Sequence, residues 1–383
     1  MCKVVIKVSY EWSFVLKKRI AIIESGFINF YIENLVSLCR KNGVSIDLIT
    51  NKKDSEYKEL FDKTFFIFEN FSHKNFRRRK ELEDKIKSII DISAYDYIFA
   101  DGLGLSFCCT VFHNPTLAFT LKSYKNFFYK KIIQIGHIRR LFNERFYYKN
   151  SPKIFVVSNI LADDYEKHCK IDKDKITIVY PGSQIAKDED TRPFSKISDD
   201  EFFIIGQSST GLVPKGGYIF LKALRIFRKK YPRIRFRARM IYPKYKKFSL
   251  LYFYLKLFRL ENFVEVLPYQ KAMKDFYNSL NCFCCVSQYE AFGRVVTEAM
   301  SYKLPVILTS NIGAVDVVMD NETAFVCLAN KKVEENIADK LASVYKNYNN
   351  LEQFGEIARE SVKKYTWEKM AKDIFYTLYN VSF

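Results

Sequence analysis

Short apolar runs alternate along the chain with segments in which apolar residues recur every three or four positions. An apolar run over 19–24 is followed by a helical stripe over 28–42, which ends at Gly43, and then by a strand pattern over 44–50. This order predicts a strand–helix–strand unit with parallel strands and a right-handed crossover. Further strands are expected over 97–101, 108–113, 153–158 and 175–180.

A polar, highly charged segment over 184–200 interrupts this series and favours a linker between two domains. A second series then begins with an apolar strand over 202–206. It continues with helices near 216–230 and 293–302 and with strands near 234–241, 281–287 and 304–309. The expected fold class is α/β, with two doubly wound domains that face a central cleft. Ligands of such sheets bind at the carboxyl ends of the strands.

The net positive charge of the chain points to an anionic partner. The 383 residues include 62 Lys+Arg and 43 Asp+Glu, a formal net charge of +19, and 48% of them are hydrophobic, which excludes a disordered chain. The positive excess calls for nucleic acid, an anionic membrane or phosphate-bearing ligands. It is concentrated in two windows without any acid, 102–143 with six Lys/Arg and 202–260 with 15. In the second window, arginines at 233, 235, 237 and 239 alternate with apolar residues, which predicts a strand with one basic face at or near a sheet edge.

The first window overlaps a stripe of apolar residues at helical spacing, for which two interpretations stay open. Within residues 125–149 the apolar positions have helical spacing, basic residues accompany them, and no acid precedes Glu144. The stripe consists of Phe128, Ile132, Ile135, Phe142 and Phe146. Basic residues beside aromatics suit the interface of an anionic bilayer. The same stripe would equally serve a helix that packs on the sheet.

Neither a membrane span nor a metal site is expected. No apolar run reaches the roughly 18 residues that a spanning helix needs, and the first residues lack the pattern of a signal peptide. The nine cysteines are typical of reduced thiols in a cytosolic chain, and those at 282–285 lack zinc spacing. Residues 188–190 match an Asp-x-Asp metal pattern, but their place in the polar segment favours a solvated acidic turn.

The segment over 289–298 carries the most informative chemistry. Glu290 ends an expected strand-to-helix loop, Gly293 lets the backbone bend there, and Glu298 lies about two helical turns further on. A helix N-terminus favours phosphate, and carboxylates bind the hydroxyls of a sugar or a ribose. By spacing alone, two exposed glutamates on an ordinary helix are the alternative.

This segment resembles the Glu–seven residues–Glu signature of the retaining family-four glycosyltransferases (glycosyl transferases group 1), which have the GT-B fold. The resemblance covers roughly residues 19–380. Its other motifs are Gly206 with Pro214-Lys215-Gly216, His113-Asn114-Pro115, Val156-Val-Ser158, residues 176–182, Ala299-Met300, residues 304–309, Gly313 and the start of the last helix at 365–368.

The resemblance implies three parts of the chain. A Rossmann-like acceptor-binding domain would occupy 1–190, with no role assigned to 1–17. A Rossmann-like nucleotide-sugar-binding domain would occupy 191–364, and a C-terminal helix over 365–383 would cross back to the first domain. The implied reaction moves a sugar from a nucleotide-diphosphate donor to a hydroxyl of a glycan or lipid-linked glycan with retention of configuration. It requires no enzymic nucleophile, no metal and no other cofactor.

The resemblance also carries roles to individual residues. Glu290, His113 and Lys215 are the expected catalytic residues: Glu290 contacts the donor sugar, His113 lies over it, and Lys215 neutralises the diphosphate. Glu298 would bind the ribose, and Gly26 would keep the first loop close to the phosphates or to the acceptor. The remaining residues expected at the donor are Gly206, Gln207, Phe292, Gly293 and Arg294.

Four positions depart from the family pattern. Gln207 stands where the family has a phosphate-binding Arg, so Lys215 and Arg294 are expected to supply the positive charge. Lys303 replaces a helix-ending glycine, which predicts a left-handed backbone at a residue other than glycine. Ala324 and Asp316 replace a usual glycine and a usual glutamate.

The expected donor is a UDP-sugar, with a GDP-sugar as the second choice. The acceptor is a glycan or lipid-linked glycan of surface polysaccharide or lipopolysaccharide synthesis, and the protein would lie peripherally on the inner, anionic face of the cell membrane. No nucleic acid is expected, because no recognised nucleic-acid-binding motif is present. The alternatives are a nucleic-acid-binding protein, and a sugar-nucleotide epimerase or phosphorylase with the GT-B fold.

Overall fold

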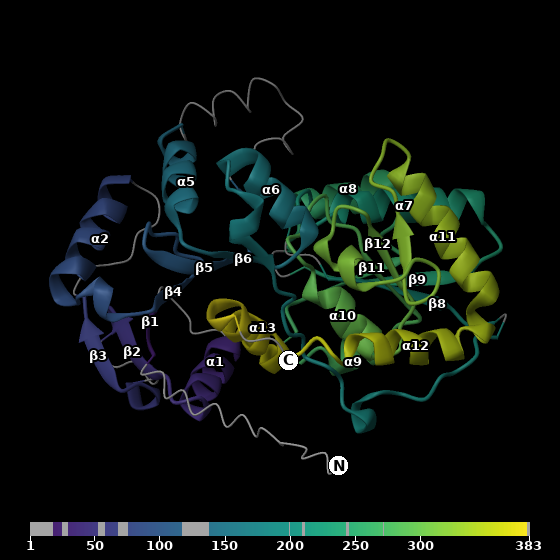
Figure 1. Cartoon of the computed structure of the whole chain (residues 1–383). Helices are drawn as coiled ribbons and strands as arrows, with labels where there is room; N and C mark the ends of the chain where they lie inside the picture. Colours follow the sequence, from purple (N-terminus) through teal and green to yellow (C-terminus); the bar gives the residue numbers. More distant parts are fainter. Residues whose placement is uncertain are drawn as a thin grey trace, which may run out of the picture.

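The chain forms two parallel β-sheets with helices on both faces (Figure 1). The computed structural model describes residues 18–24, 30–52, 58–67, 76–116, 138–198, 200–208, 211–242, 245–270 and 272–380. The first sheet has seven strands in the order β3-β2-β1-β4-β5-β6-β7, and the second has six in the order β10-β9-β8-β11-β12-β13. The expected α/β fold class is confirmed.

The first sheet is built from short runs of apolar residues that are largely buried, as parallel strands covered on both faces require. Its strands are β1 (Arg19–Ile23), β2 (Ser45–Thr50), β3 (Lys63–Phe66), β4 (Tyr97–Asp101), β5 (Cys108–Phe112), β6 (Ile154–Val156) and β7 (Ile176–Ile178). Its helices are α1 (Phe30–Lys41), α2 (Phe76–Ile89), α5 (Ile138–Asn150) and α6 (Asn159–Cys169). The sequence pattern did not predict β3, α2 and α6. β3 is a four-residue edge strand that is only partly buried, so it carries little periodicity.

The second sheet follows the same plan. Its strands are β8 (Phe203–Ser208), β9 (Phe236–Ile241), β10 (Val264–Leu267), β11 (Cys282–Cys285), β12 (Val306–Thr309) and β13 (Phe325–Cys327). Its helices are α7 (Gly217–Lys230), α8 (Leu250–Phe258), α9 (Lys274–Asn278), α10 (Arg294–Ser301), α11 (Val333–Asn347) and α12 (Glu352–Val362). β9 lies beside the edge strand β10, and Arg237 and Arg239 share its more exposed face. The predicted basic strand is therefore shorter than expected, because Arg233 and Arg235 precede β9.

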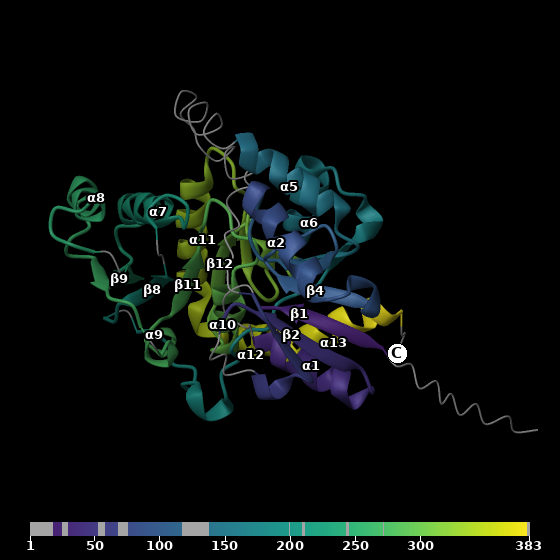
Figure 2. The same ribbon diagram turned by 90° about the vertical axis from the view of Figure 1, so that its left-hand side faces the viewer.

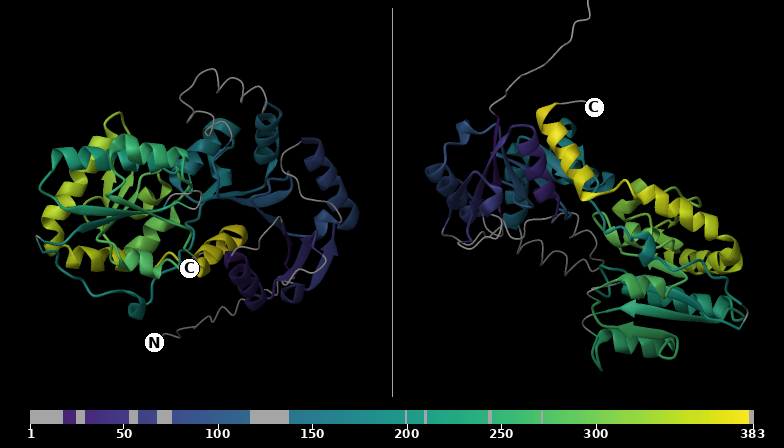
Figure 3. Two further views of the ribbon diagram at one scale, coloured as in Figure 1. Left: turned by 180° about the vertical axis from the view of Figure 1, so that it is seen from behind. Right: turned by 90° about the horizontal axis from the view of Figure 1, so that it is seen from below.

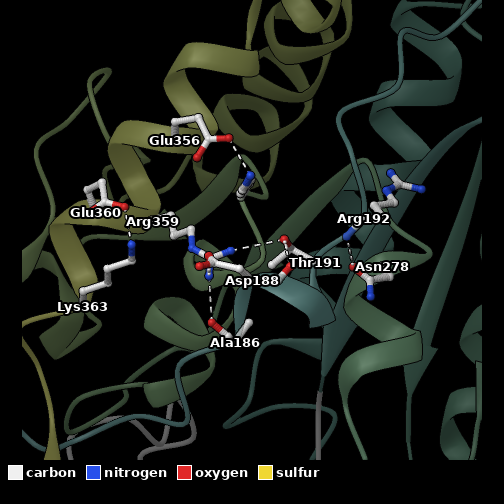
Figure 4. A network of polar contacts seen from close by, with 10 residues as sticks. Ala186, Asp188, Thr191, Arg192, Asn278, Glu356, Arg359, Glu360 and Lys363 are labelled. Carbon is white, nitrogen blue, oxygen red and sulfur yellow. Dashed lines mark hydrogen bonds and ion pairs between the residues drawn. The ribbon is translucent and has the colours of Figure 1, made fainter.

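The polar segment over 184–200 is fastened to the second domain rather than loose. Arg359 of α12, whose side chain is almost fully buried, binds Asp188 at 2.6 Å and donates to the carbonyl of Ala186 at 2.9 Å (Figure 4). Lys274 binds Asp190 at 2.7 Å. The Asp-x-Asp pattern is thus held by cationic side chains, and no group of residues suited to a metal ion occurs in the part of the chain that the structure describes.

The helix α13 (Trp367–Tyr379) begins at a Thr366 side chain that accepts a hydrogen bond from the Lys369 amide, and it packs against α1. Tyr97 of β4 donates a hydrogen bond to the carbonyl of Leu378. Viewed from below, α12 and α13 run along one side of the molecule from the second sheet to the first (Figure 3). The domain boundaries implied by the resemblance stay predictions.

Direct hydrogen bonds join the loop and helix after β6 of the first sheet to loops of the second domain. Ser158, after β6, donates to the carbonyl of Ala291 at 2.6 Å, and the amide of Asn159 donates to Asp316 at 2.6 Å. The two segments by which the chain passes between the sheets also touch, because the amide of Ser183 donates to the carbonyl of Tyr365 at 3.2 Å.

Only part of the helix expected over 125–149 falls within the described residues, as α5. Its Phe142 and Phe146 are 74% and 50% exposed. At these two positions the stripe does not pack on the sheet. Among the described residues, no helix is long and apolar enough to cross a membrane.

Candidate active site

A cavity of about 310 Å³ lies between the two sheets, where strand ends from both of them meet. It is lined by His113, Val157, Pro181, Glu290, Ala291, Phe292, Gly293, Arg294 and Trp367. These residues come from the loops after β5, β6, β7 and β11 and from the starts of α10 and α13. The cavity therefore lies at the carboxyl edge of the strands, where doubly wound sheets bind their ligands.

One wall of the cavity is the loop from β11 to α10, and its shape depends on Gly293. This residue precedes the first turn of α10 with φ +92°, and a Cβ placed on it would lie 2.8 Å from Cγ2 of Ile312. Glycine adopts this backbone without strain and leaves room for the neighbouring loop. The loop is bonded to the segment after β12, since the amide of Gly313 donates to the carbonyl of Glu290 at 3.0 Å.

Lys215 and Glu290 meet at this edge. The Lys215 ammonium lies 2.5 Å from Oε2 of Glu290, with both side chains partly exposed. The contact depends on Gly216, which has φ +72° and whose added Cβ would lie only 1.9 Å from the carbonyl oxygen of Val286. The loop after β8 is therefore pressed against the loop after β11, which brings the two charged groups together.

Gln207 and Gly206 support the Lys215 loop from within β8. The side chain of Gln207 is buried, and its amide nitrogen donates to the carbonyl of Lys215 at 3.3 Å. The amide oxygen of Gln207 has no hydrogen-bond partner among the described residues. A Cβ on Gly206 would lie 2.1 Å from Cδ1 of Leu280, so this glycine provides room for close packing. Neither residue lines the cavity.

Glu298 lies on α10, about one turn beyond Arg294 at the cavity, and does not itself line the cavity. Tyr277 donates a hydrogen bond to its carboxylate over 3.4 Å. Burial raises the pKa of Glu298, while the nearby charge of Arg294 acts in the opposite direction. A half-buried carboxylate beside a cation is suited to accept hydrogen bonds from hydroxyl groups.

His113 is fixed from behind by a carboxylate that the sequence analysis did not select. Its Nε2 lies 3.0 Å from Oδ1 of Asp101, and the hydroxyl of Tyr31 donates to the same oxygen over 2.7 Å. Asp101 ends β4 and His113 follows the adjacent strand β5, so both side chains emerge at one sheet edge. Both strand ends were predicted, and this adjacency is the signal that could have revealed Asp101.

Trp367 forms a wall that the sequence analysis recognised only as the start of the last helix. Its ring stacks with Tyr31 of α1 at 6.4 Å, and the guanidinium of Arg294 lies 5.4 Å from its centre. A Cβ on Gly182 would lie 2.3 Å from the Trp367 amide nitrogen, so the glycine makes room for this residue. An aromatic side chain from the C-terminal helix thus contacts both a cation from the start of α10 and a phenol from α1.

Comparisons with known proteins agree with this arrangement. Residues 28–186 match the family model described as Glycosyltransferase Family 4, and residues 188–361 match the model of Glycosyl transferases group 1. The chain belongs to the group 1 glycosyltransferases.

Relatives of this group 1 glycosyltransferase are distant. The chain is 32% identical over 101 residues to the capsular polysaccharide biosynthesis glycosyltransferase CapM of Staphylococcus aureus, which covers 25% of the chain and 26% of CapM. Across the first three curated relatives that it matches, the chain spans between 25% and 53% of their length.

Solved structures show the same GT-B fold. WaaG, a glycosyltransferase involved in lipopolysaccharide biosynthesis, has a TM-score of 0.67 at 14% identity and covers 94% of this chain and 99% of its own. HepE of Anabaena, solved in complex with UDP-glucose, has a TM-score of 0.63 at 13% identity and covers 95% of this chain and 100% of its own.

Within this glycosyltransferase the structure brings together many of the residues chosen from the sequence. Five of them line the cavity: His113, Glu290, Phe292, Gly293 and Arg294. Lys215 joins them through its ion pair, whereas Gly206, Gln207 and Glu298 lie behind the cavity wall. Gly26 lies outside the described residues. Lys303 has φ +62°, which confirms the left-handed backbone predicted there.

Proposed function

We propose that the protein transfers a sugar from a nucleotide-diphosphate donor to a hydroxyl of a glycan or lipid-linked glycan, with retention of anomeric configuration. The observation that carries this proposal is the Lys215–Glu290 pair at the edge of a cavity that His113 lines from the other domain. Similarity to CapM and WaaG supports a role in surface polysaccharide or lipopolysaccharide synthesis. The UDP-glucose complex of HepE supports a UDP-sugar as the first donor to test.

In this proposal the donor diphosphate binds at the start of α10. The first turn of α10 after Gly293 presents the amides of a helix N-terminus, where the helix dipole favours an anion. Lys215 and Arg294 add two positive charges, which stabilise the negative charge that grows on the leaving diphosphate. Glu298, deeper along the same helix, takes the ribose hydroxyls.

The sugar lies in the cavity between Glu290 and His113. Each side chain binds a sugar hydroxyl, and the contact with Asp101 fixes the orientation of the His113 ring at the cavity. Fixed groups of this kind lower the barrier mainly by orienting the donor and acceptor before reaction.

The acceptor hydroxyl attacks the anomeric carbon on the face from which the diphosphate departs. The bond from that carbon to the diphosphate oxygen breaks, a bond to the acceptor oxygen forms, and the acceptor proton passes to the departing diphosphate. No step uses a metal ion, and no enzyme side chain becomes covalently attached to the sugar. The protein acts at the inner face of a cell membrane that presents the acceptor.

The test begins with thermal-shift measurements against nucleotides and nucleotide sugars, because a ligand that binds the native state raises its apparent stability. With the donor identified, Lys215→Ala and Glu290→Ala are each expected to lower transfer by about a hundredfold or more while the chain stays folded. Lys230→Ala is the matched control, since Lys230 forms an exposed ion pair with Asp339 outside the cavity. Wild-type transfer in both site variants would overturn the assignment.

A further inference from the structure

α8 is apolar around most of its circumference, although it lies at the surface of the second domain. Leu251, Leu255 and Phe258 are buried in the core beneath it. Leu250, Phe253 and Leu257 form a second stripe at helical spacing on the outside and are 54% to 65% exposed. A surface helix normally has a polar outer face, so a second apolar stripe indicates a partner that receives it.

The turn before α8 presents a further aromatic residue to solvent. Phe248 is 68% exposed and has φ +64°, a backbone conformation that bulky residues rarely adopt. Its ring lies 5.7 Å from that of Tyr252 on the first turn of the helix. The aromatic side chain is thus held outward at a cost in backbone strain rather than folded into the core.

Exposed cations surround this outer stripe. Lys246 and Lys247 precede α8, Lys256 lies on it and Arg259 ends it. None of the four forms an ion pair with a carboxylate in the described part of the chain. The sequence has no acid from 202 to 260, and the next one, Glu261, follows the end of the helix. Exposed apolar side chains beside cations that form no ion pair are complementary to an anionic lipid surface. A protein partner would need a groove that is both apolar and anionic.

The start of α8 shares an edge of the second sheet with the Lys215 loop. The segment before α8 follows the carboxyl end of β9, which pairs with β8, and the loop after β8 carries Lys215. Val213 of that loop is also about half exposed. The turn before α8 and the Lys215 loop therefore both lie at the carboxyl edge of this sheet.

The first domain offers a second contact on the same side. α5 bears the exposed Phe142 and Phe146, with Arg145 and Lys149 exposed beside them. α5 and α8 both lie toward the upper end of the molecule in Figure 1, and Figure 2 shows them apart across its width, with α7 and α11 between them.

We propose that α8 and the turn before it dock on an anionic lipid bilayer. Phe248, Leu250, Phe253 and Leu257 enter the interface between headgroups and acyl chains, and the four neighbouring cations bind headgroup phosphates. The inference rests on the proposed function and deepens it, because it names the surface by which the protein would reach a membrane that holds a lipid-linked acceptor. Docking on vesicles does not itself depend on catalysis.

The test measures sedimentation of the full chain with vesicles of phosphatidylcholine alone or mixed with phosphatidylglycerol. The wild-type protein is expected to bind only the mixed vesicles, and less at high salt. The triple variant Leu250→Ser, Phe253→Ser, Leu257→Ser should lose at least about tenfold in affinity, because three side chains no longer leave water. The matched control replaces Met319, Leu328 and Ile357, which are exposed apolar residues elsewhere, by serine and should bind as the wild type does.

The charge variant Lys246→Glu, Lys247→Glu should lose its preference for phosphatidylglycerol. Equal vesicle binding by the wild type and the triple variant would overturn the proposal. So would an α8-dependent dimer seen by light scattering without vesicle binding, or binding to an oligonucleotide instead of vesicles. Thermal stabilisation by the donor nucleotide, measured on the same samples, reports separately on the proposed function. Its loss with vesicle binding intact would refute the donor site and leave the docking surface standing.

Discussion

The contact between Gly216 and Val286 allows a sharp prediction about the Lys215 loop. In Gly216→Ala, the new methyl carbon would lie 1.9 Å from the carbonyl oxygen and 2.4 Å from the carbonyl carbon of Val286. Both neighbours are backbone atoms, so no side chain can turn aside. A normal contact of about 3.5 Å requires the two loops to separate by more than about 1 Å.

The cost has two parts that a second variant separates. A left-handed alanine costs about 1–2 kcal/mol, and forcing extra volume into a packed site costs about 1–3 kcal/mol more. Gly43 has a similar φ of +68° but nothing within 4 Å of an added Cβ, so Gly43→Ala bears only the first cost. We therefore expect Gly216→Ala to lower the free energy of unfolding by about 2–5 kcal/mol and Gly43→Ala by about 1–2 kcal/mol.

Urea denaturation measures both losses, and thermal shift with the donor nucleotide reports on the loop. Separation of the loops moves Lys215 away from Glu290, so Gly216→Ala should also lose most of the nucleotide-induced stabilisation, which Gly43→Ala should retain. Equal losses of stability in the two variants would refute the argument from the Val286 contact. Undiminished nucleotide stabilisation in Gly216→Ala would refute the link between this contact and the donor.

Three further predictions concern side chains around the site. Asp101→Asn should lower transfer by roughly 10- to 100-fold with little change in donor binding, because His113 loses a charged hydrogen-bond partner worth about 1.5–3 kcal/mol; unchanged steady-state turnover would contradict this role. Burial raises the pKa of Glu298, so the native state holds this proton more tightly, and the contribution of Glu298 to stability should fall as pH rises through and above the ordinary glutamate pKa of about 4.3. Glu298→Gln should remove that fall in urea titrations from pH 4 to 8 yet weaken nucleotide binding, and an unaltered pH profile would count against the burial. Arg359→Ala should lower the free energy of unfolding by about 2–4 kcal/mol, because the carbonyl of Ala186 loses its partner and Asp188 is released. A loss below about 1 kcal/mol would show that these bonds to the polar segment over 184–200 are dispensable for stability.

Periodicity predicted most of the elements that build the site, because buried parallel strands are short apolar runs and their crossover helices repeat every three or four residues. It missed the edge strands β3, β10 and β13, and it extended the basic strand back to Arg233. Arginine and apolar residues already alternate from the turn at 232–233 onward, and only the backbone pairing shows that β9 begins at Phe236.

The chemistry of the site was predictable where it follows one stretch of chain. Glu290, Gly293 and Arg294 lie on a single loop and helix start, so their spacing alone brings them together. Asp101 and Trp367 escaped notice because they meet their partners only through the pairing of β4 with β5 and the return of α13 to the first domain. Gln207 was expected at the donor, but the sequence could not show that its side chain turns inward beneath the Lys215 loop.

The hydrogen bond from Ser183 to Tyr365 has a mechanical consequence. Both covalent crossings between the sheets lie side by side at this bond, so the two domains are joined by backbone at one place rather than at two separate ones. A turn of one domain about that place would change the gap between His113 and Glu290 across the cavity, and it would first have to break the bonds from Ser158 to Ala291 and from Asn159 to Asp316. These few bonds therefore set the width of the site.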